Sequence, residues 1–188
     1  MDLQRLQQQL ATIPATSKVW PPAHWQPTQC GDIPIRINRD GQWFYQNSAI
    51  QRPELVTLFS SVLHRQGTDY HLTTPVESVR IQVDDAPFVL VDWQWLPSEL
   101  GPVLQVKDNL ARSYLIGAEY PVQLQTEPMS GELLPYLQLA RGLTAKFSRP
   151  CYYQLVAQLT PLLINGQACY ALESGGYPVV FATADAEA

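Results

Sequence analysis

The sequence predicts an α+β protein of two similar small lobes, each an antiparallel sheet packed with one main helix. Alternating apolar and polar residues typical of strands recur along the chain, and two segments carry apolar residues at helical spacing. Between these halves, residues 96–102 break the strand pattern with two prolines and a glycine. A 188-residue chain that is 46% hydrophobic can bury two small cores. We therefore expect a lead-in (residues 1–27), a first lobe (28–96) and a second lobe (97–188).

The lead-in is expected to combine a short helix with an extended segment. Leu3, Leu6 and Leu10 form a narrow apolar stripe at helical spacing. Such a helix can dock on the rest of the protein or on a partner, or it can fray, because it is marginally stable alone. Four prolines between residues 14 and 27 then favour an extended run over the surface, anchored by Trp20 and Trp25.

The first lobe is expected to centre on a β-hairpin. Ile33, Ile35 and Ile37 alternate with other residues, which places all three on one face of a strand and Arg36 on the other. The turn is predicted at residues 40–41, an Asp-Gly pair, because glycine adopts the positive φ that a tight hairpin needs. Residues 43–45 then form the returning strand.

A helix and three more strands are expected to complete this lobe. The helix is predicted to begin at Pro53 and to cover the isoleucine face with Leu55, Leu58, Phe59, Val62 and Leu63. The strands are predicted at residues 70–73, 77–83 and 88–95, with a turn at 84–87. Glu77 has the inward parity of its strand, so its carboxylate is expected to need an arginine partner, either Arg36 or Arg52.

The second lobe is expected to repeat this plan. Strands are predicted at residues 103–106, 113–116, 122–124 and 136–139, and a closing hairpin at 162–164, 168–173 and 177–182. An apolar residue recurs at every fourth position from Leu143 to Leu159, which predicts a helix over residues 142–158, kinked or restarted at Pro150. In each lobe an arginine, Arg52 or Arg141, precedes the helix, and this indicates a duplication.

Composition and charge argue against several classes of protein. A net charge of −5 and a pI near 5.1 disfavour a binder of nucleic-acid polymers, which relies on clustered lysine and arginine. Three widely spaced cysteines fit a reducing compartment, so we expect a cytoplasmic protein. The sequence lacks a signal-peptide pattern and the run of roughly 20 apolar residues that a membrane span requires.

The sequence shows no catalytic, metal or cofactor motif. His24, His64 and His71 lack metal-ligand spacing with one another or with a cysteine, so we expect no metal and no cofactor. The Ser-Gly-Gly run at residues 174–176 is interpreted as a turn rather than a phosphate cradle, because strands flank it. Cys151 lies on the apolar helical stripe and is predicted to be packed and inert.

Arginines at the ends of strands and helices are the candidate binding residues. A guanidinium suits phosphate or carboxylate recognition, and an aromatic ring can stack a base. The candidate ligand-binding set comprises Arg36, Trp43, Arg52, Glu77, Arg80 and Arg141. Alternatively, these arginines and Arg149 pair with acidic residues and stabilise the lobes; the candidate acids are Asp40, Glu77, Asp85 and Glu173.

Three segments resemble a bacterial family catalogued as a domain of unknown function, and the match covers nearly the whole chain. They are GDIPIRINRDGQWFYQNSAIQRPELVTLFSSVL, TTPVESVRIQVDDAPFVLV and RGLTAKFSRPCYYQLV. The resemblance implies a duplicated domain, a pleckstrin-homology-like C-terminal half and a ligand site at the lobe interface, with a nucleotide-like ligand and a signalling role. The chain departs from the family pattern at residues 47–50 and 107–109. The family has no established catalytic residue to carry over.

Three functions are compatible with these observations. The first is a non-catalytic regulatory or sensor protein that binds a small anionic, nucleotide-like ligand between its lobes. The second is a protein–protein interaction module that uses Trp20, Trp25, Trp95 and the leucine stripe of the lead-in. The third is a hydrolase that uses Glu77, Asp85 and a histidine as acid and base.

Overall fold

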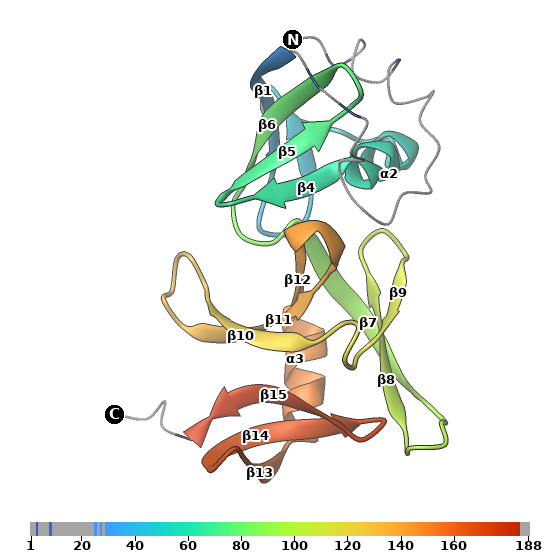
Figure 1. The fold of residues 1–188 in the computed structure, drawn as a ribbon, viewed down its shortest axis with the longest axis vertical. Helices are drawn as coiled ribbons and strands as arrows, with labels where there is room; N and C mark the ends of the chain where they lie inside the picture. The colour runs from blue at the N-terminus through green and yellow to red at the C-terminus, as the bar shows by residue number, and fades with distance from the viewer. Residues whose placement is uncertain (1–2, 4–7, 9–24, 26, 28, 185–188) are drawn as a thin grey trace. The chain divides into compact units, whose positions relative to one another are not determined.

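The computed structural model describes residues 3, 8, 25, 27 and 29–184 (Figure 1). The predicted helix and lead-in therefore lie outside the described residues, apart from four single positions. The chain forms two compact units: unit 1 is Met1–Pro87 with Ala140–Leu143, and unit 2 is Phe88–Leu139 with Thr144–Ala188. The two-lobe prediction is confirmed. The units divide after Pro87 and not at residue 96, because the strand that follows Pro87 pairs within unit 2.

Unit 1 is built on a six-stranded sheet, sheet A. Its elements are β1 (Gln29–Ile37), β2 (Trp43–Tyr45), β3 (Ser48–Ala49), α2 (Pro53–Ser61), β4 (Leu63–Gln66), β5 (Asp69–Thr73) and β6 (Glu77–Val83). The strand order is β3-β2-β1-β6-β5-β4. The central pair β1–β6 is parallel and the others are antiparallel, so the prediction of a purely antiparallel sheet is wrong. A parallel pair joins strands distant in sequence, which local patterns do not reveal.

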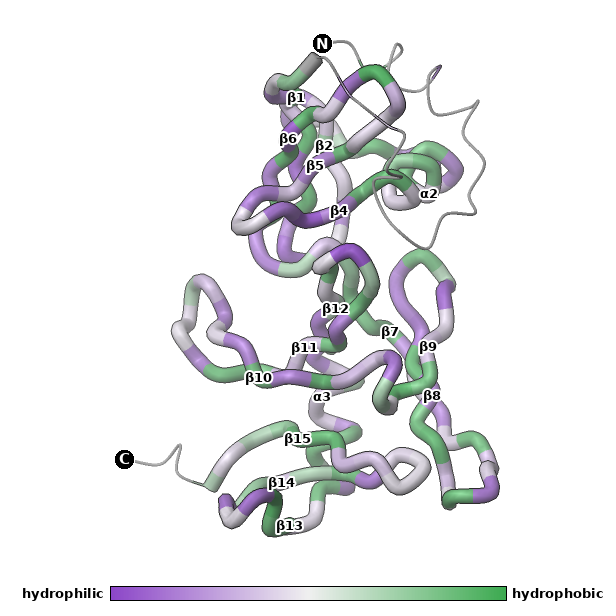
Figure 2. The backbone as a smooth tube through the Cα atoms, viewed as in Figure 1, coloured by the Kyte–Doolittle hydropathy of each residue, from purple (hydrophilic) through white to green (hydrophobic). Residues whose placement is uncertain are grey.

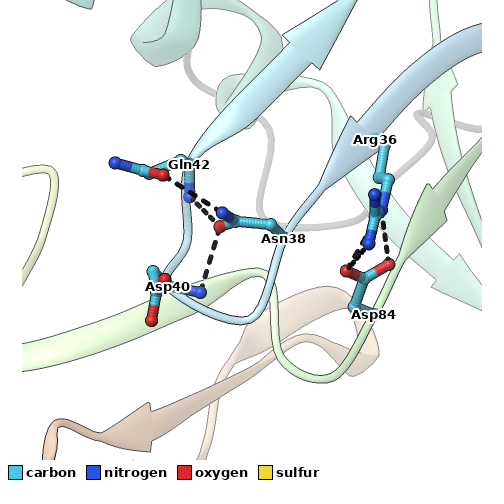
Figure 3. Close-up of polar contacts among 5 residues, drawn as sticks. All are labelled: Arg36, Asn38, Asp40, Gln42 and Asp84. Atoms are coloured by element: carbon cyan, nitrogen blue, oxygen red, sulfur yellow. Dashed lines mark hydrogen bonds and ion pairs between the residues drawn. The ribbon is translucent and has the colours of Figure 1, made fainter. Parts of the chain in front are cut away.

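The predicted hairpin is present at the start of unit 1. Ile33, Ile35 and Ile37 are 4%, 1% and 0% exposed. The Asn38 side-chain oxygen accepts hydrogen bonds from the backbone N–H groups of Asp40 and Gln42, at 3.0 and 2.9 Å, and so closes the turn (Figure 3). Gly41 at φ 73° supplies the positive dihedral that the Asp-Gly pair predicted.

Helix α2 begins where the sequence predicts. Pro53 occupies the first turn, where its missing N–H costs no hydrogen bond, and the Arg52 carbonyl accepts from the N–H groups of Leu55 and Val56. Phe59, which is 0% exposed, brings the helix against the hairpin. The apolar face of α2 therefore closes the core of unit 1.

Unit 2 contains two sheets. Sheet B comprises β7 (Phe88–Leu96), β8 (Val103–Asp108), β9 (Ser113–Leu115), β10 (Val122–Thr126), β11 (Leu133–Gln138) and β12 (Thr144–Phe147). After α3 (Arg149–Val156), sheet C comprises β13 (Thr160–Ile164), β14 (Gln167–Ser174) and β15 (Tyr177–Thr183). The described part of the protein is thus mostly β, and Figure 2 shows apolar and polar segments alternating along its strands.

The two six-stranded sheets share one strand order, which supports the predicted duplication. Sheet B is β10-β11-β12-β7-β8-β9, and its β12–β7 pair is parallel. Strands β1–β3 of sheet A correspond to β7–β9 of sheet B, and β4–β6 correspond to β10–β12; with this correspondence the two strand orders are the same. In both, two three-stranded meanders meet through the first strand of one and the last strand of the other. Only the first repeat carries its helix between the meanders.

The predicted helix over residues 142–158 is half wrong. Only Arg149–Val156 is helical, and β12 precedes it. A four-residue apolar spacing also satisfies the two-residue period of a strand: Phe147 is buried at the end of β12, and Leu143 is buried just before that strand begins. Ser148 caps α3, because its hydroxyl accepts from the Cys151 N–H at 3.5 Å. Cys151 is 3% exposed, as its place on the stripe predicted.

Candidate functional site

One row of polar side chains crosses sheet A. His64 of β4 lies opposite His71 of β5, His71 lies opposite Arg80 of β6, and Arg80 lies opposite Asp32 of β1. Residues directly opposite each other share a face, so all four side chains lie on one face of the sheet. We call these four residues the polar row. The residues adjacent to these in sequence point to the other face, the core face. Three of them lie opposite one another and are fully buried: Leu63, Leu72 and Val79.

Arg80 is held in the polar row by two carboxylates. Its Nε donates to Asp32 Oδ1 at 2.8 Å and its Nη2 donates to Asp32 Oδ2 at 3.1 Å. Its Nη1 also lies 3.6 Å from Asp69 Oδ2. The hydrogen bonds lower the pKa of Asp32 and raise that of Arg80. Because the Arg80 side chain is 51% exposed, solvent screens these pairs.

Arg36 lies on the same face, on β1, opposite Gln82 of β6. Its Nε donates to Asp84 Oδ1 at 2.8 Å and its Nη2 to Asp84 Oδ2 at 2.5 Å (Figure 3). These bonds raise the pKa of Arg36. The ion pair supports the alternative in which this arginine stabilises its lobe by pairing with an acidic residue. The acid is Asp84, which was not among the candidate acids.

His64 and His71 form the buried end of the polar row. Their ring centroids are 5.7 Å apart and their planes are inclined by 32°. His64 is 6% exposed, and the Nδ1 atoms of both rings are buried without a hydrogen-bond partner among the described residues. Burial is the main cause that lowers the pKa of His64 to about 4; the charges of His71 and Arg141 act in the same direction, and backbone hydrogen bonds with Val62 and His71 act against it. The sequence analysis gave neither histidine a role. The signal that could have paired them is the two-residue hairpin loop at 67–68, which sets His64 opposite His71.

Arg141 belongs to unit 1 and lies in a short turn rather than at the start of a helix. It lies in the 3-10 turn η1 (Ala140–Gly142), at φ 66°, and its Nη1 donates to the carbonyl oxygen of Ser61 at the end of α2. Gly142 lies close to Arg65 of β4, since a Cβ at Gly142 would be 3.4 Å from the Arg65 Cβ. The turn thus holds the Arg141 guanidinium at the end of α2, where its charge helps to lower the pKa of His64. The predicted role of Arg141 as the residue that opens the helix is wrong; Arg149 has that position.

The other three candidate residues do not join the polar row. Trp43 is 2% exposed and stacks on Phe59 in the core. Glu77 is 0% exposed, and its parity with Val79 places it on the core face, opposite to the strand histidines. Arg52 is exposed at the start of α2. The acid–base pairing of Glu77 with a histidine, which a hydrolase would need, is therefore not supported by this arrangement.

The described residues offer no metal centre. Among them, no group of three histidine, cysteine, aspartate or glutamate side chains could hold a metal ion. In the same part of the chain, no helix is long and apolar enough to cross a membrane.

Comparison with known proteins assigns both halves to one family description. Residues 21–86 match the N-terminal domain model, "Domain of unknown function (DUF1285)", and residues 87–181 match the C-terminal domain model, "Protein of unknown function (DUF1285)". The junction between the two matches lies within one residue of the boundary between the two compact units, which follows Pro87. A search of functionally curated proteins found no match.

Two solved structures are similar to this chain. A DUF1285 family protein from Silicibacter pomeroyi DSS-3 is 36% identical, with 96% of each chain covered and a TM-score of 0.79. A DUF1285 family protein from Shewanella baltica OS155 is 31% identical, covers 68% of this chain and 94% of its own, and has a TM-score of 0.54. The first likeness therefore extends over both units.

Proposed function

Since this chain belongs to the DUF1285 family, whose description names no activity, we propose from its own geometry that it is a non-catalytic regulatory or sensor protein that binds a small anionic, nucleotide-like ligand. The proposal includes a pleckstrin-homology-like character for the second lobe and a role in signal transduction. It assigns the anion to the polar face of sheet A.

One observation carries the proposal: Arg36 and Arg80 lie on one face of sheet A, and the charge of Arg141 acts on His64 of the same face. The planar guanidinium fork matches the geometry of phosphate and carboxylate groups. Arg36 and Arg80 are both half exposed, at 51%. Exposed ion pairs contribute little to stability, so a phosphate can replace an aspartate carboxylate on such a guanidinium at low cost. In the free protein, Asp84 and Asp32 keep the guanidinium groups of Arg36 and Arg80 oriented.

Thermal-shift measurements on the full chain test this function. We expect nucleoside phosphates to raise the melting temperature, since a ligand at 100 times its Kd stabilises the folded state by about 2.7 kcal/mol. The rise should shrink in Arg80→Ala and in Arg36→Ala. It should persist in Lys107→Ala, which removes an exposed cation from unit 2. Absence of stabilisation by every anion, or equal loss in all three variants, would count against the proposal.

An interaction module is the second candidate, and the outer face of sheet C favours it. Leu163 is 75% exposed and Tyr170 is 47% exposed, and residues 150–172 contain no charged side chain. Uncharged exposed apolar surface marks many interaction sites. Trp95, one of the tryptophans that the sequence suggested, fits less well, because its indole N–H donates to the Gln158 side chain at 3.1 Å. Partner binding that is lost in Leu163→Glu and kept in Leu133→Glu would support this alternative.

A further inference from the structure

The buried ends of His64 and His71 need an explanation. Buried polar atoms in folded proteins are almost always hydrogen-bonded, and an unpaired one costs about 1–3 kcal/mol. Here two such atoms, both Nδ1, occur on neighbouring rings whose centroids are 5.7 Å apart. Two unsatisfied nitrogens at one place indicate a site that is completed by something other than the described side chains.

The charges around the pair favour an anion over a metal ion. Arg141 of η1 binds the carbonyl oxygen of Ser61, three residues before His64, and its charge acts on the His64 ring; Arg80 of β6 lies opposite His71. Two carboxylates on this face, Asp32 of the row and Asp69 of β5, are already held by Arg80. A divalent cation would meet two guanidinium groups and find no third histidine, cysteine or carboxylate ligand among the described residues. An oxyanion would meet positive charge and two imidazoles able to donate hydrogen bonds.

We propose that His64, His71 and Arg141 form a site for a single tetrahedral oxyanion, the class of a phosphate group, and that binding is accompanied by uptake of a proton by the histidine pair. The inference rests on the proposed function and narrows it from the whole polar face to this end of the row.

The proton comes from solvent and resides on a ring nitrogen, which then donates to the anion. The charged groups around the pair are Arg141 of η1, which acts on His64 through its charge, Arg80 of β6, Asp32 of β1 and Asp69 of β5. In the free protein, burial and the neighbouring cation disfavour a charged imidazole. A bound anion reverses that balance, because opposite charges at short range stabilise each other. Affinity should therefore increase as the pH falls, by at most tenfold per pH unit for one proton.

Calorimetric titration of the full chain with inorganic sulfate tests this inference, because sulfate itself does not titrate near neutral pH. Measured in two buffers of different ionisation enthalpy, binding should take up a proton, and affinity should rise several-fold from pH 7.5 to pH 6. His64→Gln, His71→Gln and Arg141→Gln should each weaken binding at least tenfold. Lys107→Gln, which removes an exposed cation of unit 2, should leave sulfate affinity within twofold of the wild-type value.

The outcomes separate this inference from the proposed function. Sulfate affinity that is unchanged in both histidine variants and lost in Arg80→Ala would overturn the histidine site and leave anion binding on the polar face intact. Absence of binding by sulfate and by nucleoside phosphates would overturn both. Stabilisation by Ni²⁺ or Zn²⁺ without any by sulfate would show a metal site instead. Circular dichroism of each variant distinguishes a lost contact from a lost fold, and Arg141→Lys, which keeps the charge, should recover part of the affinity.

Discussion

Trp43 stacks on Phe59 in the core of unit 1, with ring centroids 6.2 Å apart and planes inclined by 28°. One residue comes from the hairpin and the other from helix α2, so this contact joins the two elements that the sequence predicts best. Trp43 shares the buried face of Ile37, its partner in the hairpin register. Its aromatic surface is therefore used by the fold.

Trp43→Ala should destabilise unit 1 by about 3–5 kcal/mol, the usual cost of truncating a buried aromatic residue. Trp43→Phe should cost less, because it keeps a ring against Phe59 and removes an indole N–H that has no hydrogen-bond partner among the described residues. Urea denaturation followed by circular dichroism measures both. Tyr153→Ala, at a 66% exposed site, is the control and should change stability by less than about 0.5 kcal/mol. A stable Trp43→Ala protein with impaired ligand binding would instead support base stacking.

Stability should fall in mild acid because of His64. Its pKa in the folded state is about 4, below the ordinary value of 6.5, mainly through burial. The unfolded chain therefore binds a proton before the folded protein does. The stability linked to this group is complete above pH 6.5 and is lost progressively between pH 6.5 and pH 4. After allowance for solvent screening, the loss should be on the order of 1–3 kcal/mol.

Denaturation curves at several pH values in sulfate-free buffer check this dependence. His64→Gln removes the titrating ring, so the difference between variant and wild type should grow smaller as the pH falls from 6.5 to 4. A difference that does not vary with pH over this range would mean that His64 keeps an ordinary pKa.

Local patterns predicted the parts of this fold that depend on neighbouring residues. Ile33, Ile35 and Ile37, the Asp-Gly turn and Pro53 specify the hairpin and α2 through period, positive φ and a missing N–H. The parallel pairs β1–β6 and β12–β7 depend on residues more than 40 positions apart, which no local period encodes. At residues 143–147, a spacing of four fits strand and helix alike. The Ser-Arg-Pro run at 148–150, a helix cap followed by proline, was the stronger signal for the start of α3.

The candidate site was predictable only in part for the same reason. Arginines were identified by chemistry, and two of them, Arg36 and Arg80, do lie on one polar face. Their partners are set by register: Asp32 and Arg80 are 48 residues apart and meet because β1 and β6 are paired in parallel. Burial likewise removed Trp43 from the surface. Residue chemistry thus suggests which groups can bind, and pairing between strands decides which of them meet.

Asp108 should be essential for the stability of unit 2. It is 1% exposed, and its carboxylate accepts from the backbone N–H groups of Leu110 and Arg112 at 2.9 Å, from Arg112 Nε at 2.7 Å and from the Tyr114 hydroxyl at 3.1 Å. Removal of one partner from a buried charged network costs about 3–5 kcal/mol. We therefore expect Asp108→Ala to lower the unfolding free energy by that amount, measured by chemical denaturation. The exposed Asp92→Ala is the matched control, and equal effects in the two variants would contradict this role.

Gly175 and Gly176 offer a test of whether packing or backbone conformation maintains the turn between β14 and β15. Both have positive φ, 56° and 78°, so alanine at either position is strained, by about 1–2 kcal/mol. They differ in their surroundings. A Cβ at Gly175 would lie 2.8 Å from Val103 Cγ2, whereas a Cβ at Gly176 would meet nothing within 4 Å.

We expect Gly176→Ala to show the backbone cost alone and Gly175→Ala to be more destabilised, because β-branched Val103 cannot move aside by changing a flexible torsion. Chemical denaturation of both variants gives the difference. A double-mutant cycle with Val103→Ala isolates its source: the extra cost at Gly175 should largely disappear in the double variant, whereas the cost at Gly176 should be unaffected. Equal destabilisation of the two single variants would mean that the close approach to Val103 is relieved without penalty. The turn would then depend on backbone conformation alone.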